Sequence, residues 1–175
     1  MTPLRSRETR LIVGLQRLPV ARALVPVGRA LSLFGEHAAG WILLGVVGAV
    51  VDSSRWEAWL GGVVAVVLAH GLSIAVKRVI RRPRPGNDPS VAVYASAPSK
   101  LSFPSSHASS TMAAAVVYSA LLPALWPVAV LVVVAMGASR VILGMHFPTD
   151  VLAGFALGLV VGIPAALLLL PLAAG

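Results

Sequence analysis

Long apolar runs alternate with short polar stretches along most of this chain. Five of the runs read as membrane-spanning helices, and they cover residues about 38–51, 58–77, 107–123, 126–143 and 151–172. A hydrocarbon core of about 30 Å needs roughly 20 helical residues. The first run is short, so we expect it to borrow flanking residues such as His37 or to be tilted. The pattern predicts an all-α integral membrane bundle with five transmembrane helices.

Residues 9–34 show a different pattern. Leu, Val and Ile recur there at helical intervals, but Arg10, Arg17, Arg22 and Arg29 interrupt them. An arginine at the centre of a bilayer costs roughly 2.5–3.5 kcal/mol on insertion scales. We therefore expect an amphipathic helix in the membrane interface, with a sixth transmembrane helix as the alternative. Because Arg17 breaks any apolar core, the segment is not expected to be a cleaved signal.

Two further patterns concern the connections and the packing. The polar insert over residues 81–100 is rich in proline and carries a Gly-Asn-Asp turn signal, so we expect an irregular loop outside the hydrocarbon. The last apolar run carries Gly154, Gly158 and Gly162 at a spacing of four. Such glycines leave a smooth groove on one helix face, which predicts close packing against a neighbouring helix.

Composition strengthens the membrane assignment. The chain of 175 residues is 58% hydrophobic and only 11% charged, and its mean hydropathy of +0.90 lies outside the range of soluble domains. Five spans and their connections consume most of this length, so we expect a single membrane-embedded domain over residues 1–175. The absence of cysteine excludes disulfides and thiolate metal sites.

The formal net charge of +8 limits the classes of partner that the protein is expected to bind. Such a charge suits nucleic acid, anionic lipid or a phosphate-bearing substrate. The cations border the apolar runs and no aromatic residues are interleaved with them, so nucleic acid is not expected. The expected partners are the bilayer, a membrane lipid substrate and phosphate, whereas the oligomeric state is left open.

The polar residues gather at one side of the predicted bundle. If the five runs alternate in direction, the end of the second, the start of the third, the end of the fourth and the start of the fifth emerge together. Those four places hold the three polar clusters of the chain, which are Lys77 with Arg84-Pro85, Phe103-Pro104-Ser105-Ser106-His107, and Ser139-Arg140 with His146 and Asp150. One patch of membrane surface thus collects cations, two histidines and a carboxylate, as a phosphate site requires.

The cations and the helix start suit phosphate binding. Arg84 and Arg140 can offer paired N–H donors to phosphoryl oxygens, and Lys77 supplies a compact charge. A Pro-Ser-Ser sequence is typical of a helix N-terminus, so Ser105 and Ser106 lie where free backbone N–H groups attract an anion.

The histidines supply reactivity. A neutral imidazole can attack phosphorus while a carboxylate orients its other ring nitrogen, and a second, protonated imidazole can donate to the leaving oxygen. Pro148 disfavours helical geometry at Phe147 and marks the start of the fifth helix. His146 is therefore expected on the lead-in loop, with Asp150 in the first turn reaching back to it.

These clusters resemble the three-part signature of the type 2 phosphatidic acid phosphatase superfamily, written K-x6-RP, PSGH and SR-x5-H-x3-D. The first motif can be read in one register only, because Arg84-Pro85 has Lys77 at the required distance and Arg82-Pro83 has Ala75 there. The chain departs from the pattern at Ser106, where the family commonly has glycine. The match covers residues 77–150, and three spaced motifs in order are far more specific than any one alone.

The resemblance implies a phosphatase that uses a phosphohistidine intermediate and needs no metal or other cofactor. By position, His146 is the implied nucleophile, Asp150 its partner and His107 the proton donor to the leaving group. The residues implied to hold the phosphoryl group are Lys77, Arg84, Ser105, Ser106 and Arg140. Vanadium haloperoxidases are similar at these motifs, but they are soluble, and the apolar runs argue against that branch.

The polar residues have other interpretations. Two histidines and a carboxylate can form a metal site, but this leaves three cations unexplained. His70, inside the second run, is interpreted as a hydrogen-bonded packing residue, and Glu36-His37 as an anchor at the interface. The basic residues Arg78, Arg81 and Arg82 are interpreted as nonspecific contacts to lipid phosphates.

The location and the substrate follow from charge and resemblance. The five-span reading puts all Lys and Arg residues except Arg55 on the site side, so the positive-inside rule predicts a multi-pass cell-membrane protein with a cytoplasmic catalytic face. The chain looks similar to small bacterial family members proposed to act on decaprenylphosphoryl-phosphoribose, so a phosphorylated polyprenyl lipid, including a polyprenyl diphosphate, is the leading expected substrate. The alternatives are phosphatidylglycerophosphate or phosphatidate, and, in another class, a non-catalytic lipid-phosphate carrier or flippase.

Overall fold

The structure is a computed structural model that describes residues 3–97 and 99–173, and the described residues form helices and loops without a strand. The helices are α1 (Pro3–Arg17), α2 (Pro19–Ala23), α3 (Val25–Gly35), α4 (Ala39–Val51), α5 (Trp56–Ile80), α6 (Ser106–Leu121), α7 (Trp126–Ile142) and α8 (Pro148–Ala173). Short 3-10 turns are η1 (Glu36–Ala38), η2 (Ser53–Arg55), η3 (Pro85–Asn87) and η4 (Pro123–Leu125). The all-α prediction is confirmed for these residues.

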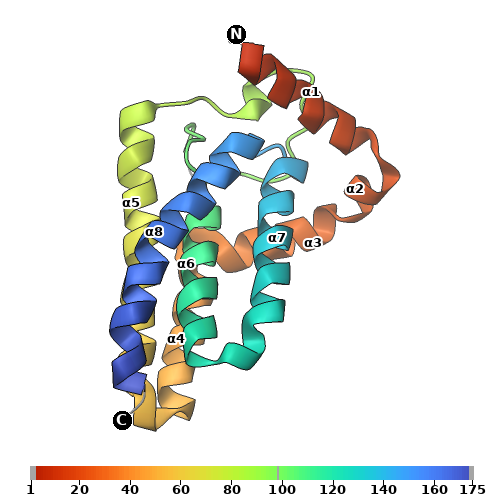
Figure 1. Cartoon of the computed structure of the whole chain (residues 1–175). Helices are drawn as coiled ribbons and strands as arrows, with labels where there is room; N and C mark the ends of the chain where they lie inside the picture. Colours follow the sequence, from red (N-terminus) through yellow and green to blue (C-terminus); the bar gives the residue numbers. More distant parts are fainter. Residues whose placement is uncertain (1–2, 98, 174–175) are drawn as a thin grey trace.

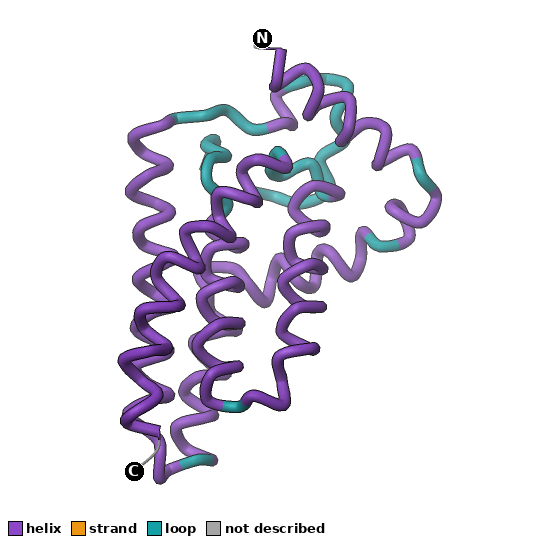
Figure 2. The backbone as a smooth tube through the Cα atoms, in the orientation of Figure 1, coloured by secondary structure: helices purple, strands orange, loops and turns teal. Residues whose placement is uncertain are grey.

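Helices α4 to α8 run alternately up and down, and α6 lies in the middle of the bundle, packed against α5, α7 and α8 (Figure 1). The C-terminal ends of α5 and α7 therefore share one end of the bundle with the N-terminal ends of α6 and α8. Figure 2 shows that most of the long loops also lie at this end, beside α1. The arrangement brings the three polar clusters of the sequence to the same end.

Four stretches among the described residues are long and apolar enough to cross a membrane, and they are Val25–Val51, Ser53–Ile80, Pro123–Ile142 and Pro148–Ala173. Helix α6 has 16 residues and is shielded by its neighbours over most of its length. The structure thus supports an integral membrane protein, with four stretches that meet the length and composition of a span.

The stretch Val25–Val51 is bent, because His37 and Ala38 take left-handed φ angles of 50° and 61°. Helix α4 begins only at Ala39 and has 13 residues, or about 20 Å. The candidate span does include the flanking His37, as expected for the short first run, but the helix is broken at that residue. Helix α3 instead crosses the bundle at a steep angle to α4 and packs against α7 (Figure 1).

The single amphipathic helix expected over residues 9–34 is also wrong, because this segment forms α1, α2 and α3. Leu18 has an extended backbone (φ −70°, ψ 133°), since the residue before a proline avoids the helical region. Helix α1 docks over the polar end of the bundle through the fully buried Ile12. The Gln16 side-chain amide also donates to the carbonyls of Ala92 (2.8 Å) and Ile142 (2.9 Å).

The glycine face of α8 packs against α6, as predicted. A Cβ atom on Gly154 would lie 2.6 Å from the Ser105 carbonyl oxygen, and one on Gly158 would lie 2.6 Å from that of Ser109. These separations are too short for any side chain, so the two backbones touch. The start of α8 is thereby held against the start of α6.

The main hydrophobic core occupies the half of the bundle away from the polar end. It is built around Trp59, Val117, Tyr118 and Leu169 from three different helices. The Tyr118 hydroxyl donates to the Trp41 carbonyl at 2.9 Å, which satisfies the polar atom of a buried ring. This apolar half leaves the other end free to carry charge.

Candidate active site

A cavity of about 290 Å³ opens at the polar end of the bundle. Six of the eight site residues predicted from the sequence line it, and they are Lys77, Arg84, Ser106, His107, Arg140 and His146. They come from the end of α5, the loop after it, the start of α6, the end of α7 and the lead-in to α8. Three segments that are distant in sequence therefore share one cavity, as the alternation of the apolar runs predicted.

His146 precedes α8 and is only 3% exposed. Its Nε2 atom lies 3.3 Å from Arg84 Nη1. A guanidinium can only donate, so Nε2 is the accepting nitrogen and the proton resides on Nδ1. Nδ1 faces Asp150 Oδ2 at 3.7 Å, which is longer than a hydrogen bond, and has no closer partner among the described residues. The imidazole thus presents a lone pair to the arginine side of the cavity.

Burial lowers the pKa of the His146 imidazole to about 4. The carboxylate of Asp150 acts in the opposite direction, while the charges of Arg84 and Lys77 lower the pKa further. The ring is consequently neutral at physiological pH. A neutral imidazole keeps the lone pair that nucleophilic attack requires.

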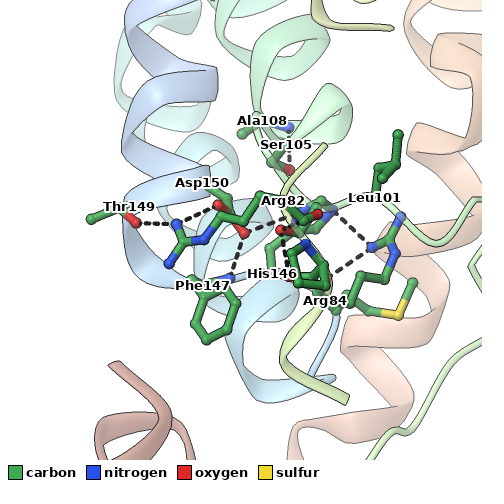
Figure 3. Close-up of polar contacts among 12 residues, drawn as sticks. Arg82, Arg84, Leu101, Ser105, Ala108, His146, Phe147, Thr149 and Asp150 are labelled. Carbon is green, nitrogen blue, oxygen red and sulfur yellow. Dashed lines mark hydrogen bonds and ion pairs between the residues drawn. The ribbon is translucent and has the colours of Figure 1, made fainter. Parts of the chain in front are cut away.

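Asp150 lies behind His146, outside the cavity lining, and its side chain is fully buried. Oδ2 accepts a hydrogen bond from the Phe147 N–H at 2.8 Å, and Oδ1 accepts one from Arg82 Nη1 at 2.7 Å (Figure 3). The Asp150 carbonyl accepts from the Ser105 N–H at 2.9 Å, which ties the start of α8 to the start of α6. The carboxylate is therefore fixed from both of its oxygens before any ligand binds.

Arg82 links Asp150 to the N-terminal helix. Its Nη1 also donates to Thr149 Oγ1 at 2.6 Å, and its Nη2 forms an ion pair with Glu8. The guanidinium lies 4.2 Å from the centre of the Phe147 ring. Because these contacts occupy it, the interpretation of Arg82 as a nonspecific contact to lipid phosphates is wrong.

Glu8 was not recognised from the sequence. It is 3% exposed and accepts hydrogen bonds from the backbone N–H (3.0 Å) and the hydroxyl (2.6 Å) of Thr149. A buried carboxylate is stable only where it is paired and hydrogen-bonded, and Glu8 satisfies both conditions. The one available signal was that Glu8 is the only acidic residue before Glu36 in a basic segment.

Two cations stand on the side of the cavity that His146 faces. Arg84 is held by the Ser99 carbonyl, which accepts from Nε, and by the Met145 carbonyl, which accepts from Nη1, both at 2.8 Å. Burial lowers the pKa of the Arg84 guanidinium from its usual high value. Lys77 lines the cavity from α5 and is 7% exposed. Both cations are placed to meet an anion next to His146 Nε2.

Arg140 lines the same cavity as these two cations and is completely buried. Its Nη1 donates to Ser32 Oγ at 3.0 Å, its Nη2 to the Gly28 carbonyl at 3.3 Å and its Nε to Ser139 Oγ at 3.1 Å. Helix α3 thus positions a predicted phosphate-binding residue. The sequence pattern did not reveal this, because it assigned α3 to the membrane interface.

His107 faces the cavity from the first turn of α6. Its Nε2 lies 3.0 Å from the Ser32 carbonyl oxygen, which can only accept, so Nε2 carries a proton. The ring packs tightly on α3, since a Cβ atom on Gly35 would come within 2.7 Å of His107 Cδ2. Ser32 and Gly35 are therefore further site residues that motif spacing did not reveal.

The two serines at the start of α6 have different positions. Ser106 lines the cavity. Ser105 is the N-cap residue, fully buried, with Oγ accepting from the Ala108 N–H at 3.3 Å. This confirms the predicted helix start, whereas a phosphate-binding role for the Ser105 hydroxyl stays a prediction.

The cavity also contains residues that the sequence did not assign to the site. Glu36, His37, His70, Ile74 and Arg78 complete much of its lining. The Nδ1 atom of His70 is buried without a hydrogen-bond partner among the described residues, so its interpretation as a hydrogen-bonded packing residue is wrong for that atom. Within residues 3–97 and 99–173, no group of three or more His, Asp or Glu side chains is placed to hold a metal ion.

The chain is similar to known proteins of one family. The chain is 43% identical to decaprenylphosphoryl-5-phosphoribose phosphatase of Mycolicibacterium smegmatis over 84% of this chain and 81% of that protein. It is 40% identical to the enzyme of the same name from Mycobacterium tuberculosis over 89% and 86% of the two chains.

A solved structure is also similar. The crystal structure of a transmembrane PAP2 type phosphatidylglycerolphosphate phosphatase from Bacillus subtilis superposes with a TM-score of 0.76 at 26% identity, covering 94% of this chain and 85% of that one. The model of the PAP2 superfamily matches residues 58–171, which hold all three polar clusters. The chain belongs to the PAP2 superfamily.

Proposed function

We propose that this protein is a membrane lipid phosphatase that removes the 5-phosphate of decaprenylphosphoryl-5-phosphoribose through a phosphohistidine intermediate. The observation that carries the reaction type is a neutral imidazole, His146, in one cavity with Lys77, Arg84 and Arg140. The identity of 40–43% to enzymes of that name, over more than four fifths of each chain, supports the substrate. The PAP2 superfamily and these relatives make the protein a lipid phosphatase.

In this proposal the phosphoryl group lies among the three cations. Lys77, Arg84 and Arg140 neutralise its oxygens, and Ser106 at the start of α6 adds a polar contact. The cations gain more from the negative charge that builds up in the transition state than from the ground state, because their partners already hold them in position. Ser105 acts with them chiefly through the helix start that it caps.

The first chemical step forms the phosphohistidine. The His146 Nε2 lone pair attacks phosphorus, and the bond between phosphorus and the ribose 5-oxygen breaks. Asp150 stabilises the positive charge that develops on the His146 ring. In this proposal the His107 ring is doubly protonated when substrate is bound, because the negative phosphoryl group favours the cationic ring; Nε2 donates to Ser32 and Nδ1 gives its proton to the departing oxygen.

The second step releases phosphate. A water molecule loses a proton to His107 Nδ1 as its oxygen attacks phosphorus. The bond between phosphorus and His146 Nε2 breaks, inorganic phosphate leaves, and His146 regains its lone pair. His107 ends the cycle protonated, as it began, so the reaction needs only water as co-substrate.

The proposal includes a membrane topology. Helices α4 to α8 cross the bilayer in alternating directions, with the buried α6 as the central one of five spans, and α1 to α3 lie on the side of the active site. Of the fourteen Lys and Arg residues only Arg55, in η2, lies at the opposite end, which leaves thirteen on the site side. By the positive-inside rule this side is cytoplasmic.

Phosphate release by the purified protein in detergent tests the proposal. The substrates are decaprenylphosphoryl-5-phosphoribose, decaprenyl diphosphate, phosphatidylglycerophosphate and phosphatidate, each with excess EDTA. We expect the ribosyl lipid to give the highest kcat/KM. We expect His146→Ala to lose on the order of 10⁴- to 10⁶-fold in kcat, as loss of a nucleophile does.

Each alternative gives a different result in this assay. Turnover that His146→Ala retains would reject the nucleophile, and activity abolished by EDTA would favour a metal site. A higher kcat/KM for phosphatidylglycerophosphate would reject the substrate but not the mechanism. Binding of every lipid without phosphate release would indicate a carrier. The unfolding temperature of the variant, compared with wild type, shows whether its fold is intact.

A further inference from the structure

The cavity continues beyond the phosphate-binding cations. His70, Ile74 and Lys77 lie on one face of α5, at intervals of four and three residues, and all three line the cavity. At about 1.5 Å per residue, His70 lies about 10 Å deeper along the helix axis than Lys77. The cavity therefore extends well past the space that a phosphoryl group between Lys77 and His146 would fill.

The deeper part of the cavity carries three polar side chains. Glu36 and His37 reach it from the bend between α3 and α4, and His70 reaches it from α5. The ring centroids of His37 and His70 are 6.3 Å apart, with the rings tilted by 54°. These side chains come from two separate elements and converge on one space.

The polar atoms here are not used up by the protein. His70 Nδ1 is buried without a hydrogen-bond partner among the described residues, and the side chains of Glu36 and His37 are exposed. An unsatisfied buried polar atom destabilises the protein, and a ligand group bonded to it would remove this cost. The guanidinium and carboxylate groups around His146, in contrast, already have protein partners.

We infer that Glu36, His37 and His70 form a second subsite, which binds the hydroxyl-bearing leaving group of the substrate. This inference rests on the proposed function and names the part of the substrate that the subsite reads, the ribose ring. One ribose hydroxyl can donate to the Glu36 carboxylate while its oxygen accepts from an imidazole N–H, and a second hydroxyl can donate to a free ring nitrogen.

The subsite predicts selectivity. A leaving group without hydroxyls leaves Glu36, His37 and His70 unpaired when it enters, so it binds less well in the transition state. Sites built to hydrogen-bond a hydroxyl can reject analogues that lack it by up to about 10⁴-fold. The enzyme should therefore discriminate ribosyl phosphates from polyprenyl diphosphates at this subsite rather than at the cations.

The test compares kcat/KM for decaprenylphosphoryl-5-phosphoribose with that for two phosphates whose leaving groups lack hydroxyls, decaprenyl diphosphate and para-nitrophenyl phosphate. We expect His70→Leu and Glu36→Gln each to lower the value for the ribosyl lipid by about 10- to 100-fold. The values for the other two should stay within about twofold. His70→Asn, which keeps a hydrogen-bonding group, should recover part of the loss, and Glu57→Gln, exposed at the far end of α5, is the matched control.

The outcomes separate the inference from the function that it rests on. If the variants lower all three rates equally, or none of them, while wild type cleaves the ribosyl lipid, the subsite is rejected and the proposed function stands. If wild type releases no phosphate from the ribosyl lipid, the proposed function itself fails. Unchanged activity on the hydroxyl-free phosphates also shows that each variant is folded.

Discussion

Two arginine–aspartate pairs lie at opposite ends of the helix bundle and have different roles. At the end away from the site, Asp52 pairs with Arg55 and accepts a hydrogen bond from Trp59 Nε1 at 3.0 Å. At the site, Asp150 pairs with Arg82 and faces His146. The first pair closes the turn between α4 and α5, whereas the second holds a carboxylate beside a reactive imidazole.

Burial explains the difference between the pairs. The Arg55 and Asp52 side chains are 28% and 23% exposed, whereas Asp150 is completely buried. The hydrogen bonds from Arg55 and Trp59 lower the pKa of the Asp52 carboxyl, yet water screens the pair and limits its contribution to stability. A buried pair instead depends strongly on both partners. The pair at Asp52 is therefore a natural control for the pair at Asp150.

The largest contrast is expected between Asp150→Asn and Asp52→Asn. An amide at position 150 keeps the volume but not the charge that stabilises the cationic His146 ring, so we expect kcat to fall by about 10⁴-fold. The Asp52 variant should stay within about twofold of wild type. Phosphate release under saturating substrate measures both, and similar losses in the two variants would contradict the role of Asp150.

A smaller contrast is expected between Arg82→Gln and Arg55→Gln. Arg82 does not line the cavity, so its loss should lower kcat by about 100-fold through misplacement of Asp150 and leave KM nearly unchanged. Arg82→Lys should recover little, because one ammonium cannot reach both Glu8 and Asp150 as the forked guanidinium does. Initial rates over a range of substrate concentrations separate kcat from KM. A rise in KM alone would mean that Arg82 binds substrate.

The smallest effect is a shift in pH dependence. Because burial lowers the pKa of His146 to about 4, the nucleophile is neutral above that pH and becomes protonated, and inactive, below it. We expect the acidic limb of kcat/KM near pH 4, with a tenfold loss per pH unit below it. A histidine with an ordinary pKa near 6.5 would already lose activity at pH 6. A limb near pH 6.5 would contradict the burial effect.

The apolar runs predicted most of the helices. Those over 58–77, 126–143 and 151–172 correspond to α5, α7 and α8, with ends displaced by a few residues. The run over 107–123 became α6, whose helix start at Ser105 and Ser106 followed from local chemistry. The length of the apolar runs succeeds here because each of these helices carries apolar side chains along most of its length.

The N-terminal third was predicted less well. Pro19 and the left-handed residues His37 and Ala38 break the chain into short helices, which the arginine spacing did not reveal. Motif spacing placed His107, Arg140 and His146 near one another in the bundle. It could not identify Glu8, Ser32 or Gly35, because their partners lie more than 70 residues away in the sequence. No local sequence pattern predicts contacts over such separations.

The glycine seam between α6 and α8 has a mechanical consequence. Gly154 brings the α8 backbone against Ser105, one residue before α6 begins and two before His107, and the Ser105 N–H bonds the carbonyl of Asp150. The separation between the proposed proton donor, His107, and the proposed nucleophile, His146, is thus fixed by backbone contact rather than by flexible side chains. When a thicker or thinner bilayer tilts these helices, they must tilt together, and the reacting geometry is carried along unchanged.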